Sequence, residues 1–258
     1  MVAVGQRNRE HPLSEEFMMS SQSKPGEGTE QIVTGIAPGY FINVAGVEDP
    51  FVRGLLASCA TVFEIKPAMA ALLTGGTPLT GGGTIEPGAD VEGDVIVGEG
   101  AVIKSGAMVV GPVYVGPGSV IAKGASVRDH SVIGPNCHIG WGADVARSLL
   151  VSDVRMKHSS FIGDSVLGRH VNVGGLVSTT ALRVNGGRVT EPATKEITVL
   201  LGDRRIGTGQ TKFGSVVADD IAIPAGAILQ PGTLIGPGTI IYPRGQVGGF
   251  FPAGSQVR

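Results

Sequence analysis

The chain has few aromatic residues and few charges for its length. Of its 258 residues, 5% are aromatic and 16% are charged, and the formal net charge is −2. A charge balance so close to zero argues against the basic surface of a nucleic-acid-binding protein and against the polybasic patch of a protein held at a membrane. We therefore expect neither nucleic acid nor membrane among its partners.

Long hydrophobic runs and paired cysteines are also missing. No apolar stretch approaches the roughly 18 residues of a membrane-spanning helix, and the N-terminus lacks the apolar core of a signal peptide. The two cysteines, Cys59 and Cys137, do not show the spacing of a disulfide framework. A cytoplasmic protein is the simplest expectation, with Cys137 as a buried thiol.

Glycine and β-branched aliphatic residues are abundant and occur in a strict order. Gly accounts for 42 residues, yet the mean hydropathy of +0.24 excludes a disordered low-complexity chain. Every sixth residue over twelve positions is Val or Ile: Ile85, Val91, Val97, Ile103, Val109, Val115, Ile121, Val127, Ile133, Ile139, Val145 and Val151. The position four residues further on is mostly small, and turn pairs such as Pro87-Gly88 lie between. This period predicts an all-β solenoid, a parallel β-helix in which three hexads form one coil.

Three regions are expected along the chain. Residues 1–30 mix charges, Ser, Gly and Gln without periodicity, which predicts a flexible N-terminal arm. Residues 31–80 are expected to form an N-terminal helical cap over the open end of the first coil, because solenoids need capped ends. Asp49 and Pro50 predict the N-cap and first residue of one helix, and Pro67 the start of a second that ends at Gly75-Gly76. Residues 81–258 form the β-helix.

The repeat is interrupted after Val151. Its phase slips, and a second series follows at Phe161, Leu167 and Val173. The repeat then disappears over an inserted loop at residues 178–212. The hexad repeat resumes at Val217, Ile223, Leu229, Ile235, Ile241 and Val247. About seven coils are expected in all.

The inserted loop itself contains strand and turn signals. Asn185-Gly186 predicts one hairpin turn, and Gly202-Asp203 predicts a second turn after a short strand over Ile197 to Leu201. Insertions in solenoids collect on one face, which is often the binding face. We therefore expect chemistry near the phase slip and this loop.

His158 is the best general-base candidate of this stretch. A neutral imidazole can take a proton from an amine or a hydroxyl near pH 7. The alternative is an ordinary surface histidine on a solenoid corner. Spacing alone leaves both interpretations open.

The segment from His158 to Gly174, HSSFIGDSVLGRHVNVG, resembles the acetyltransferase domain of bifunctional N-acetylglucosamine-1-phosphate uridylyltransferases. It also resembles archaeal sugar-1-phosphate nucleotidylyltransferases of that kind. The family pattern is a His, two residues, an aromatic residue, then aliphatic-Gly-Asp and Val-Asn-Ile-Gly. The resemblance covers about Ile85 to Val247. It implies a left-handed β-helix, a homotrimer with sites between subunits, acetyl-CoA as donor substrate and no metal.

The resemblance also implies roles for individual residues. His158 matches the base that deprotonates the amine of an amino sugar 1-phosphate, Phe161 the aromatic beside it, and Asp164 the Asp of the pattern. Arg128 matches a phosphate-binding Arg, Asp144 takes the place of a substrate-contacting Glu, and Arg147 lies beside the position of a Lys. Four cations are candidates for the phosphates of coenzyme A: Lys212, Arg244, Arg204 and Arg205.

Two positions depart from the family pattern. An Asn that contacts the acceptor falls on Ala181, and a Ser that helps to hold the tetrahedral intermediate falls on Ala225. Losing one such donor typically costs about 3 kcal/mol of transition-state stabilisation. Either other groups substitute, or the acceptor differs, or the chain does not acetylate an amino sugar.

Three functions are therefore weighed. The first is an N-acyltransferase that transfers an acetyl or similar group from coenzyme A to a small amine, with His158 as the base. The second is a non-catalytic scaffold or regulatory trimer that has lost this site. The third is a metal-dependent hydro-lyase of the carbonic anhydrase type, which needs a His-four-His spacing that is not found among His130, His138, His158 and His170.

Overall fold

A computed structural model describes residues 35–75, 81–188, 190–243 and 245–258. The predicted arm at residues 1–30 and the predicted phosphate contact Arg244 lie outside the described residues. None of the described helices is both long enough and apolar enough to cross a membrane.

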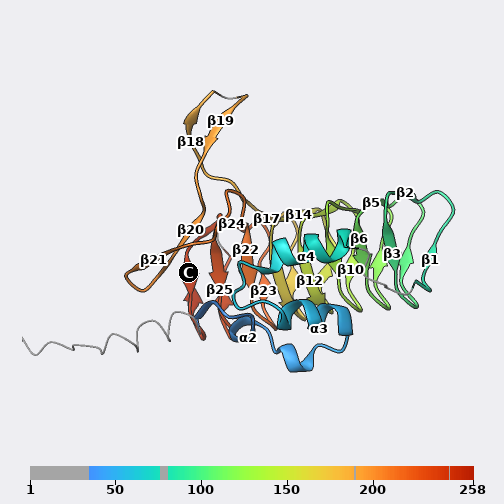
Figure 1. Cartoon of the computed structure of the whole chain (residues 1–258), viewed down its shortest axis with the longest axis horizontal. Helices are drawn as coiled ribbons and strands as arrows, with labels where there is room; N and C mark the ends of the chain where they lie inside the picture. Colours follow the sequence, from blue (N-terminus) through green and yellow to red (C-terminus); the bar gives the residue numbers. More distant parts are fainter. Residues whose placement is uncertain (1–34, 76–80, 189, 244) are drawn as a thin grey trace, which may run out of the picture.

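Three parallel sheets run along the solenoid, and each takes one strand from every coil (Figure 1). Sheet A contains β1 (Thr84–Ile85), β4 (Val102–Ile103), β7 (Val120–Ile121), β10 (His138–Ile139), β13 (Arg155–Met156), β16 (Asn172–Val173) and β23 (Ala222–Ile223). Sheet B contains β2 (Asp90–Glu92), β5 (Met108–Val110), β8 (Ser126–Arg128), β11 (Ala143–Ala146), β14 (Ser160–Gly163), β17 (Ser178–Thr179), β24 (Ile228–Leu229) and β27 (Gln246–Val247). Sheet C contains β3 (Val95–Val97), β6 (Val113–Val115), β9 (Val132–Ile133), β12 (Leu149–Ser152), β15 (Val166–Arg169), β22 (Ser215–Val217), β25 (Thr233–Ile235) and β28 (Phe250–Phe251).

The predicted parallel β-helix is confirmed, and it is longer than the sequence suggested. A parallel pair, β26 (Ile240–Ile241) and β29 (Gln256–Val257), continues the side of sheet A beyond β23. The described strands thus complete eight coils and begin a ninth, where about seven were expected. The difference arises because the slipped coils and the last coil do not keep a period of six.

The predicted hexad residues form the core of the solenoid. Ile103, Val109, Val115, Ile121 and Val127 are fully buried, as are the next members of the series up to Val145. The first coil is less well covered, because it has a neighbour on one side only: Ile85 is 48% exposed and Val91 is partly buried.

The phase slip is the loss of one residue from each of several consecutive coils. Val120 pairs with His138, a step of 18 residues, whereas His138 pairs with Arg155 and Arg155 with Asn172, steps of 17. The shortened side is the corner between sheets B and C. In place of Phe161, Ile162 is buried in the core opposite Val145, so the expected core position of Phe161 is wrong.

Buried serines bridge the coils at this shortened corner. The backbone N–H of Ser165 donates to Ser148 Oγ at 3.1 Å, and that of Ser215 donates to Ser165 Oγ at 3.0 Å. Each hydroxyl oxygen is thus the acceptor for a buried backbone N–H of the next coil. Such a partner is needed, because a buried N–H without a hydrogen bond is costly.

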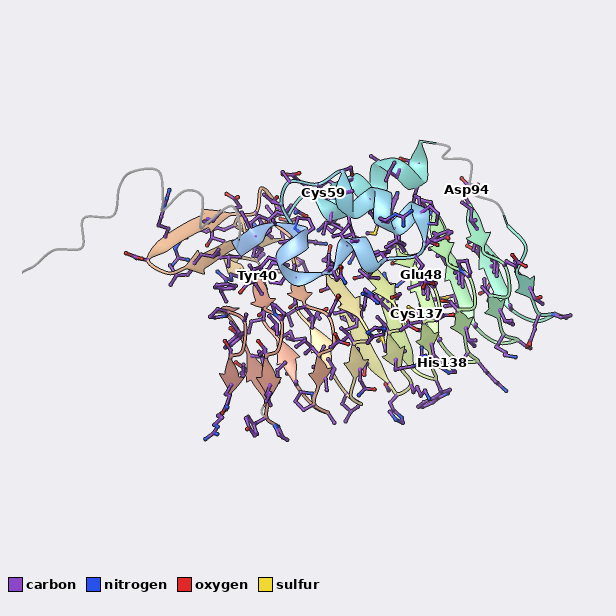
Figure 2. All side chains as sticks on the ribbon, turned by 90° about the horizontal axis from the view of Figure 1, so that it is seen from below. Tyr40, Glu48, Cys59, Asp94, Cys137 and His138 are labelled. Carbon is purple, nitrogen blue, oxygen red and sulfur yellow. The ribbon has the colours of Figure 1, made fainter. Side chains whose placement is uncertain are left out.

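In the described part of the chain, short helices lie along sheet C: α2 (Pro38–Phe41), η1 (Val44–Gly46), α3 (Pro50–Ala57) and α4 (Ile65–Thr74) (Figures 1 and 2). Asp49 is the N-cap of α3, accepting from Val52 N at 2.9 Å, and Gly75 ends α4, as expected, but α4 begins at Ile65 and not at Pro67. The helices cover a side of the solenoid instead of its open end, so the expected cap position is wrong. The reason is that the outward residues of sheet C are apolar and buried: Tyr114, Val132, Leu149, Val166, Val216 and Leu234.

The insertion forms two hairpins that leave the solenoid after β17. The outer hairpin pairs β18 (Val184–Gly187) with β19 (Pro192–Thr194), and the inner one pairs β20 (Thr198–Leu201) with β21 (Arg204–Gly207). The turn predicted at Asn185-Gly186 falls inside β18, and the chain reverses between Arg188 and Glu191 instead. The turn at Gly202-Asp203 is confirmed, with Gly202 at φ +59°.

Candidate functional site

His158 lies at an exposed corner where sheet A turns into sheet B. Gly175 occupies the same corner in the next coil, where a Cβ would come within 3.4 Å of His158 Cβ. Because a glycine stands there, the coil above leaves the imidazole open to a ligand or to another chain. The departure at Ala225 lies on this corner too, one coil beyond Gly175, since Gly226 N donates to Gly175 O.

Two large apolar side chains flank His158 on this corner. Trp141, in the coil before, is 71% exposed, and Leu176, in the coil after, is 74% exposed. The ring of Trp141 lies over Gly124, where a Cβ would come within 2.6 Å of it. We name these flanking residues, together with His158, the His158 corner.

Leu176 is held in an unfavourable backbone conformation. Its φ is +62°, at a corner position that is glycine in the four earlier regular coils: Gly88, Gly106, Gly124 and Gly142. Bulky residues rarely adopt positive φ, and such strain collects at functional sites. Both apolar residues were missed by the sequence analysis, although the hexad frame places Trp141 and Leu176 at the corner of His158.

Arg128 and Asp144 come together on the outward face of sheet B. The guanidinium of Arg128 donates to both Asp144 oxygens, Nε to Oδ1 at 3.2 Å and Nη2 to Oδ2 at 2.9 Å, and Nη1 donates to Asp129. The hydrogen bond to Asp144 raises the pKa of Arg128 further. Phe161 pairs with Asp144 one coil on, and its ring lies over Gly163.

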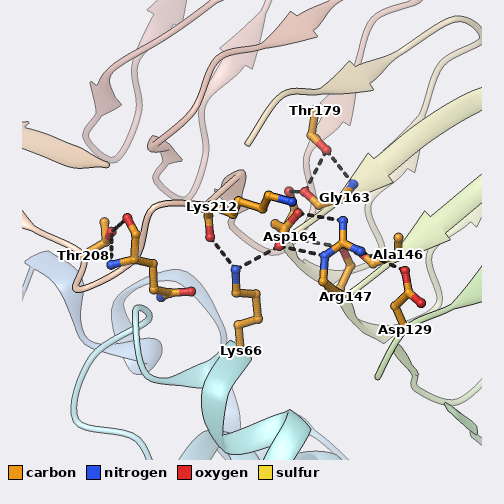
Figure 3. A network of polar contacts seen from close by, with 12 residues as sticks. Lys66, Asp129, Ala146, Arg147, Gly163, Asp164, Thr179, Thr208 and Lys212 are labelled. Atoms are coloured by element: carbon orange, nitrogen blue, oxygen red, sulfur yellow. Dashed lines mark hydrogen bonds and ion pairs between the residues drawn. The ribbon is translucent and has the colours of Figure 1, made fainter. Parts of the chain in front are cut away.

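Arg147 and Asp164 form a second network, at the shortened corner between sheets B and C (Figure 3). Asp164 is 3% exposed and accepts from Arg147 Nε at 3.0 Å and Nη2 at 3.1 Å. Arg147 Nη1 also donates to Asp129 at 2.8 Å. Burial raises the pKa of Asp164, but the hydrogen bonds from Arg147 and Lys66 outweigh it and leave the pKa below its usual value.

Lys66 completes this network and was missed by the sequence analysis. Its Nζ donates to Asp164 Oδ1 at 2.9 Å and to the carbonyl of Lys212. One ammonium group thus joins helix α4, the solenoid corner and the returning end of the insertion. No local pattern in the sequence points to Lys66, because its partners lie about a hundred residues away or more.

Three of the predicted coenzyme A contacts, Arg204, Arg205 and Lys212, belong to the insertion and not to the corner of His158. Arg204 and Arg205 are exposed on the inner hairpin, where Arg205 Nη1 donates to Thr198 Oγ1 at 3.1 Å. Lys212 lies at the base of the insertion, which a bridge between Leu182 and Lys212 closes. His158 and the insertion are attached to opposite edges of sheet B. The described residues contain no group of three or more His, Cys, Asp or Glu arranged to hold a metal ion.

Comparisons with known proteins agree with this architecture. A family model described as the GMPPB C-terminal domain matches residues 109–202. The matched residues lie within the parallel β-helix and include part of its regular hexads. No curated protein matches the sequence.

Two solved structures resemble this β-helix only weakly. A UDP-N-acetylglucosamine acyltransferase from Campylobacter jejuni is 13% identical over 70% of this chain and 68% of its own, with a TM-score of 0.23. A second UDP-N-acetylglucosamine acyltransferase is 15% identical over 67% and 71%, with a TM-score of 0.24.

Proposed function

We propose that the protein is an N-acyltransferase that uses acetyl-CoA, or a related acyl-CoA, and the amine of a small molecule. The observation that carries this proposal is the His158 corner. His158 is exposed, the residue above it in the next coil is Gly175, which has no side chain to cover it, and the preceding and following coils carry the exposed apolar residues Trp141 and Leu176 at the same corner. The resemblance of the segment from His158 to Gly174 to an acetyltransferase supports the same assignment.

The proposed reaction is a direct attack of the amine on the thioester. The amine nitrogen forms a bond to the acyl carbon, the carbon–sulfur bond breaks, and an amide and a thiol result. His158 accepts the proton that the amine loses and returns it to the leaving thiolate, so the imidazole is regenerated. No covalent intermediate on the enzyme is required.

The acceptor is proposed to be a small amine, with an amino sugar 1-phosphate as one candidate. By the resemblance, Arg128 matches an Arg that binds the sugar phosphate. In this structure the Arg128 guanidinium already donates to Asp144 and Asp129. Phosphate binding at Arg128 therefore requires that pair to open. Phe161, Asp164 and Arg147 would support this face, and Lys212, Arg204, Arg205 and Arg244 remain candidates for the donor phosphates.

A homotrimer in the cytoplasm is part of the same proposal. Trp141 and Leu176 expose large apolar surfaces that a monomer in water gains little by exposing. A neighbouring subunit that covers them would also close the site around His158 and exclude water.

The test is thiol release from acetyl-CoA and longer acyl-CoAs with a panel of small amines. His158→Ala is expected to lower kcat by about 10²–10⁴-fold, the usual share of a general base. His170→Gln is the matched control, because His170 is also an exposed imidazole but lies on another corner, 2.9 Å from Asp220. Equal activity of wild type and His158→Ala with every amine contradicts the proposal.

The internal pairing of the polar residues favours a second candidate. Because Arg128 and Arg147 are each bound to two aspartates, they can serve as structural ties in a scaffold or regulatory trimer without catalysis. Calorimetry with coenzyme A separates the two candidates. A scaffold gives no heat and no thermal shift, whereas the enzyme binds its donor.

A further inference from the structure

A groove of about 410 Å³ opens on the outward face of sheet A, away from the polar networks described above. Its lining includes Asn136 and His138 from one coil and Asp153, Arg155 and Lys157 from the next. His138 and Arg155 pair in register and point outward beside each other. The cations therefore stand on one rigid face whose spacing is set by the coils.

Positive charge exceeds negative charge in this groove. The lining contains the basic side chains of Arg155 and Lys157, and Asp153 is the only carboxylate in the described lining. Asp153 Oδ2 lies 3.8 Å from His170 Nε2, so part of its charge is directed out of the groove. The guanidinium of Arg155 is oriented by one of its nitrogens, which donates to the carbonyl of Asn136.

Lys157 differs from the equivalent lysine of an earlier coil. Lys104 occupies the same position on sheet A, and its Nζ forms an ion pair with Glu86 at 3.0 Å in the coil before. The neighbours of Lys157 at that position are Gly140 and Gly174, which have no side chain to offer. No acidic side chain therefore stands beside Lys157 at the position that Glu86 takes beside Lys104, and the space there is part of the groove.

The protonation of His138 reflects this excess of charge. Burial, then the charges of Lys157 and Arg155, lower the pKa of His138 below its usual value. The groups facing this imidazole are Arg155, Lys157 and Asp153. An anion that entered the groove would oppose the two cations and favour the protonated form.

We propose that this groove on sheet A binds the phosphate group of a small phosphorylated ligand. Arg155 offers planar N–H donors, Lys157 a mobile ammonium group, and His138 and Asn136 further donors, a set that suits a phosphate. The inference is independent of acyl transfer, although Lys157 precedes His158 and a phosphate held here would lie beside the His158 corner.

The experiment is NMR detection of the His138 ring with inorganic phosphate, coenzyme A and glucosamine 1-phosphate as separate probes. Each titration is compared with chloride at the same ionic strength. Phosphate is expected to raise the pKa of His138 by about half a unit or more in a saturable manner. A response to coenzyme A alone, or to the sugar phosphate alone, identifies the source of the phosphate.

Matched variants locate the effect. Lys157→Gln and Arg155→Gln are each expected to weaken phosphate binding by about tenfold. Lys104→Gln is the control and is expected to bind as wild type does. The proposal is overturned if no probe moves the His138 signal, or if Lys104→Gln weakens binding as much as Lys157→Gln. If the protein turns over acyl-CoA but no phosphate probe shifts the His138 signal, the phosphate groove is rejected and acyl transfer stands. If a probe shifts the His138 signal but no acyl-CoA is turned over, acyl transfer is rejected and the groove stands.

Discussion

Asp164 and Asp144 are two aspartates on neighbouring coils with very different surroundings. Asp164 is 3% exposed and is bound by Arg147 and Lys66, whereas Asp144 is 34% exposed in its pair with Arg128. When a buried carboxylate is removed, its cationic partners stay buried without a counter-charge, and the loss of stability is large. When one member of an exposed pair is removed, water screens the remaining charge, and the loss of stability is small. The two positions therefore make a direct test of what burial contributes.

Replacing Asp164 is expected to destabilise the protein severely. Asp164→Asn should lower the free energy of unfolding by about 3 kcal/mol or more, because Arg147 and Lys66 lose a buried charge partner. Asp144→Asn should cost about 1 kcal/mol or less. Urea denaturation followed by circular dichroism measures both. Equal losses at the two positions would show that the Asp164 network is not the stronger tie.

The same carboxylate makes stability depend on pH. The pKa of Asp164 is lowered in the folded state, while its unfolded value is about 3.9. The unfolded chain therefore binds this proton first, so the stabilisation is full above about pH 4 and is lost as the pH falls through the folded pKa. Wild type should lose stability more steeply on acidification than Asp164→Asn. Denaturation series across acidic pH values measure the two slopes, and parallel slopes would contradict the assignment.

At the scale of elements, the two hairpins of the insertion differ in how they are held. The inner hairpin buries Ile197 and Val199 against the solenoid, where Gly232 faces both side chains. In the outer hairpin Val184 is 56% exposed. The inner hairpin is therefore part of the folded core, whereas the outer one contributes little to it.

A pair of alanine substitutions tests this difference. Ile197→Ala is expected to lower the free energy of unfolding by about 2–4 kcal/mol, because it leaves a cavity beneath the hairpin. Val184→Ala should change it by less than about 0.5 kcal/mol. Thermal and urea unfolding give both values. If Ile197→Ala has no effect, the inner hairpin is not docked in solution.

Most elements with a local sequence signal were predicted. The hexads predicted the coil, Asp49 and Pro50 the start of α3, and Gly202-Asp203 the inner hairpin turn, whereas the turn expected at Asn185-Gly186 was misplaced. Other errors arose where the outcome depends on neighbouring coils. The position of Phe161 was wrong because the lost residue lies at a corner, and a strand reverses its facing when its register moves by one residue.

The contacts among the candidate residues could not be predicted from the sequence. His158 was selected as a candidate because it stands beside the break in the repeat and within the segment that carries the resemblance, and its role stays a prediction. The pairing of Arg128 with Asp144 follows from register between coils, which the sequence does not show directly. Lys66 comes from a helix that packs on sheet C, whose buried outward residues come from several different coils.

At the scale of the whole molecule, the exposed apolar corner predicts assembly. The mass in solution should be three times the chain mass of 26.3 kDa, and Trp141→Arg should reduce it to that of one chain. Leu200→Arg is the control, because Leu200 is 49% exposed on the inner hairpin, away from the His158 corner. Light scattering after size exclusion measures the mass. A wild-type monomer, or equal effects of the two variants, would exclude assembly through Trp141.

The helices on sheet C connect the beginning of the chain with its end. Tyr40 Oη accepts a hydrogen bond from the backbone of Ala253, 213 residues away, and Asp219 N donates to the carbonyl of Phe41. During synthesis at about 5–20 residues per second, α2 must wait roughly 10–40 s before its partners leave the ribosome. Its apolar side chains stay uncovered for that time, so chaperone binding is expected to act on the N-terminal helices first.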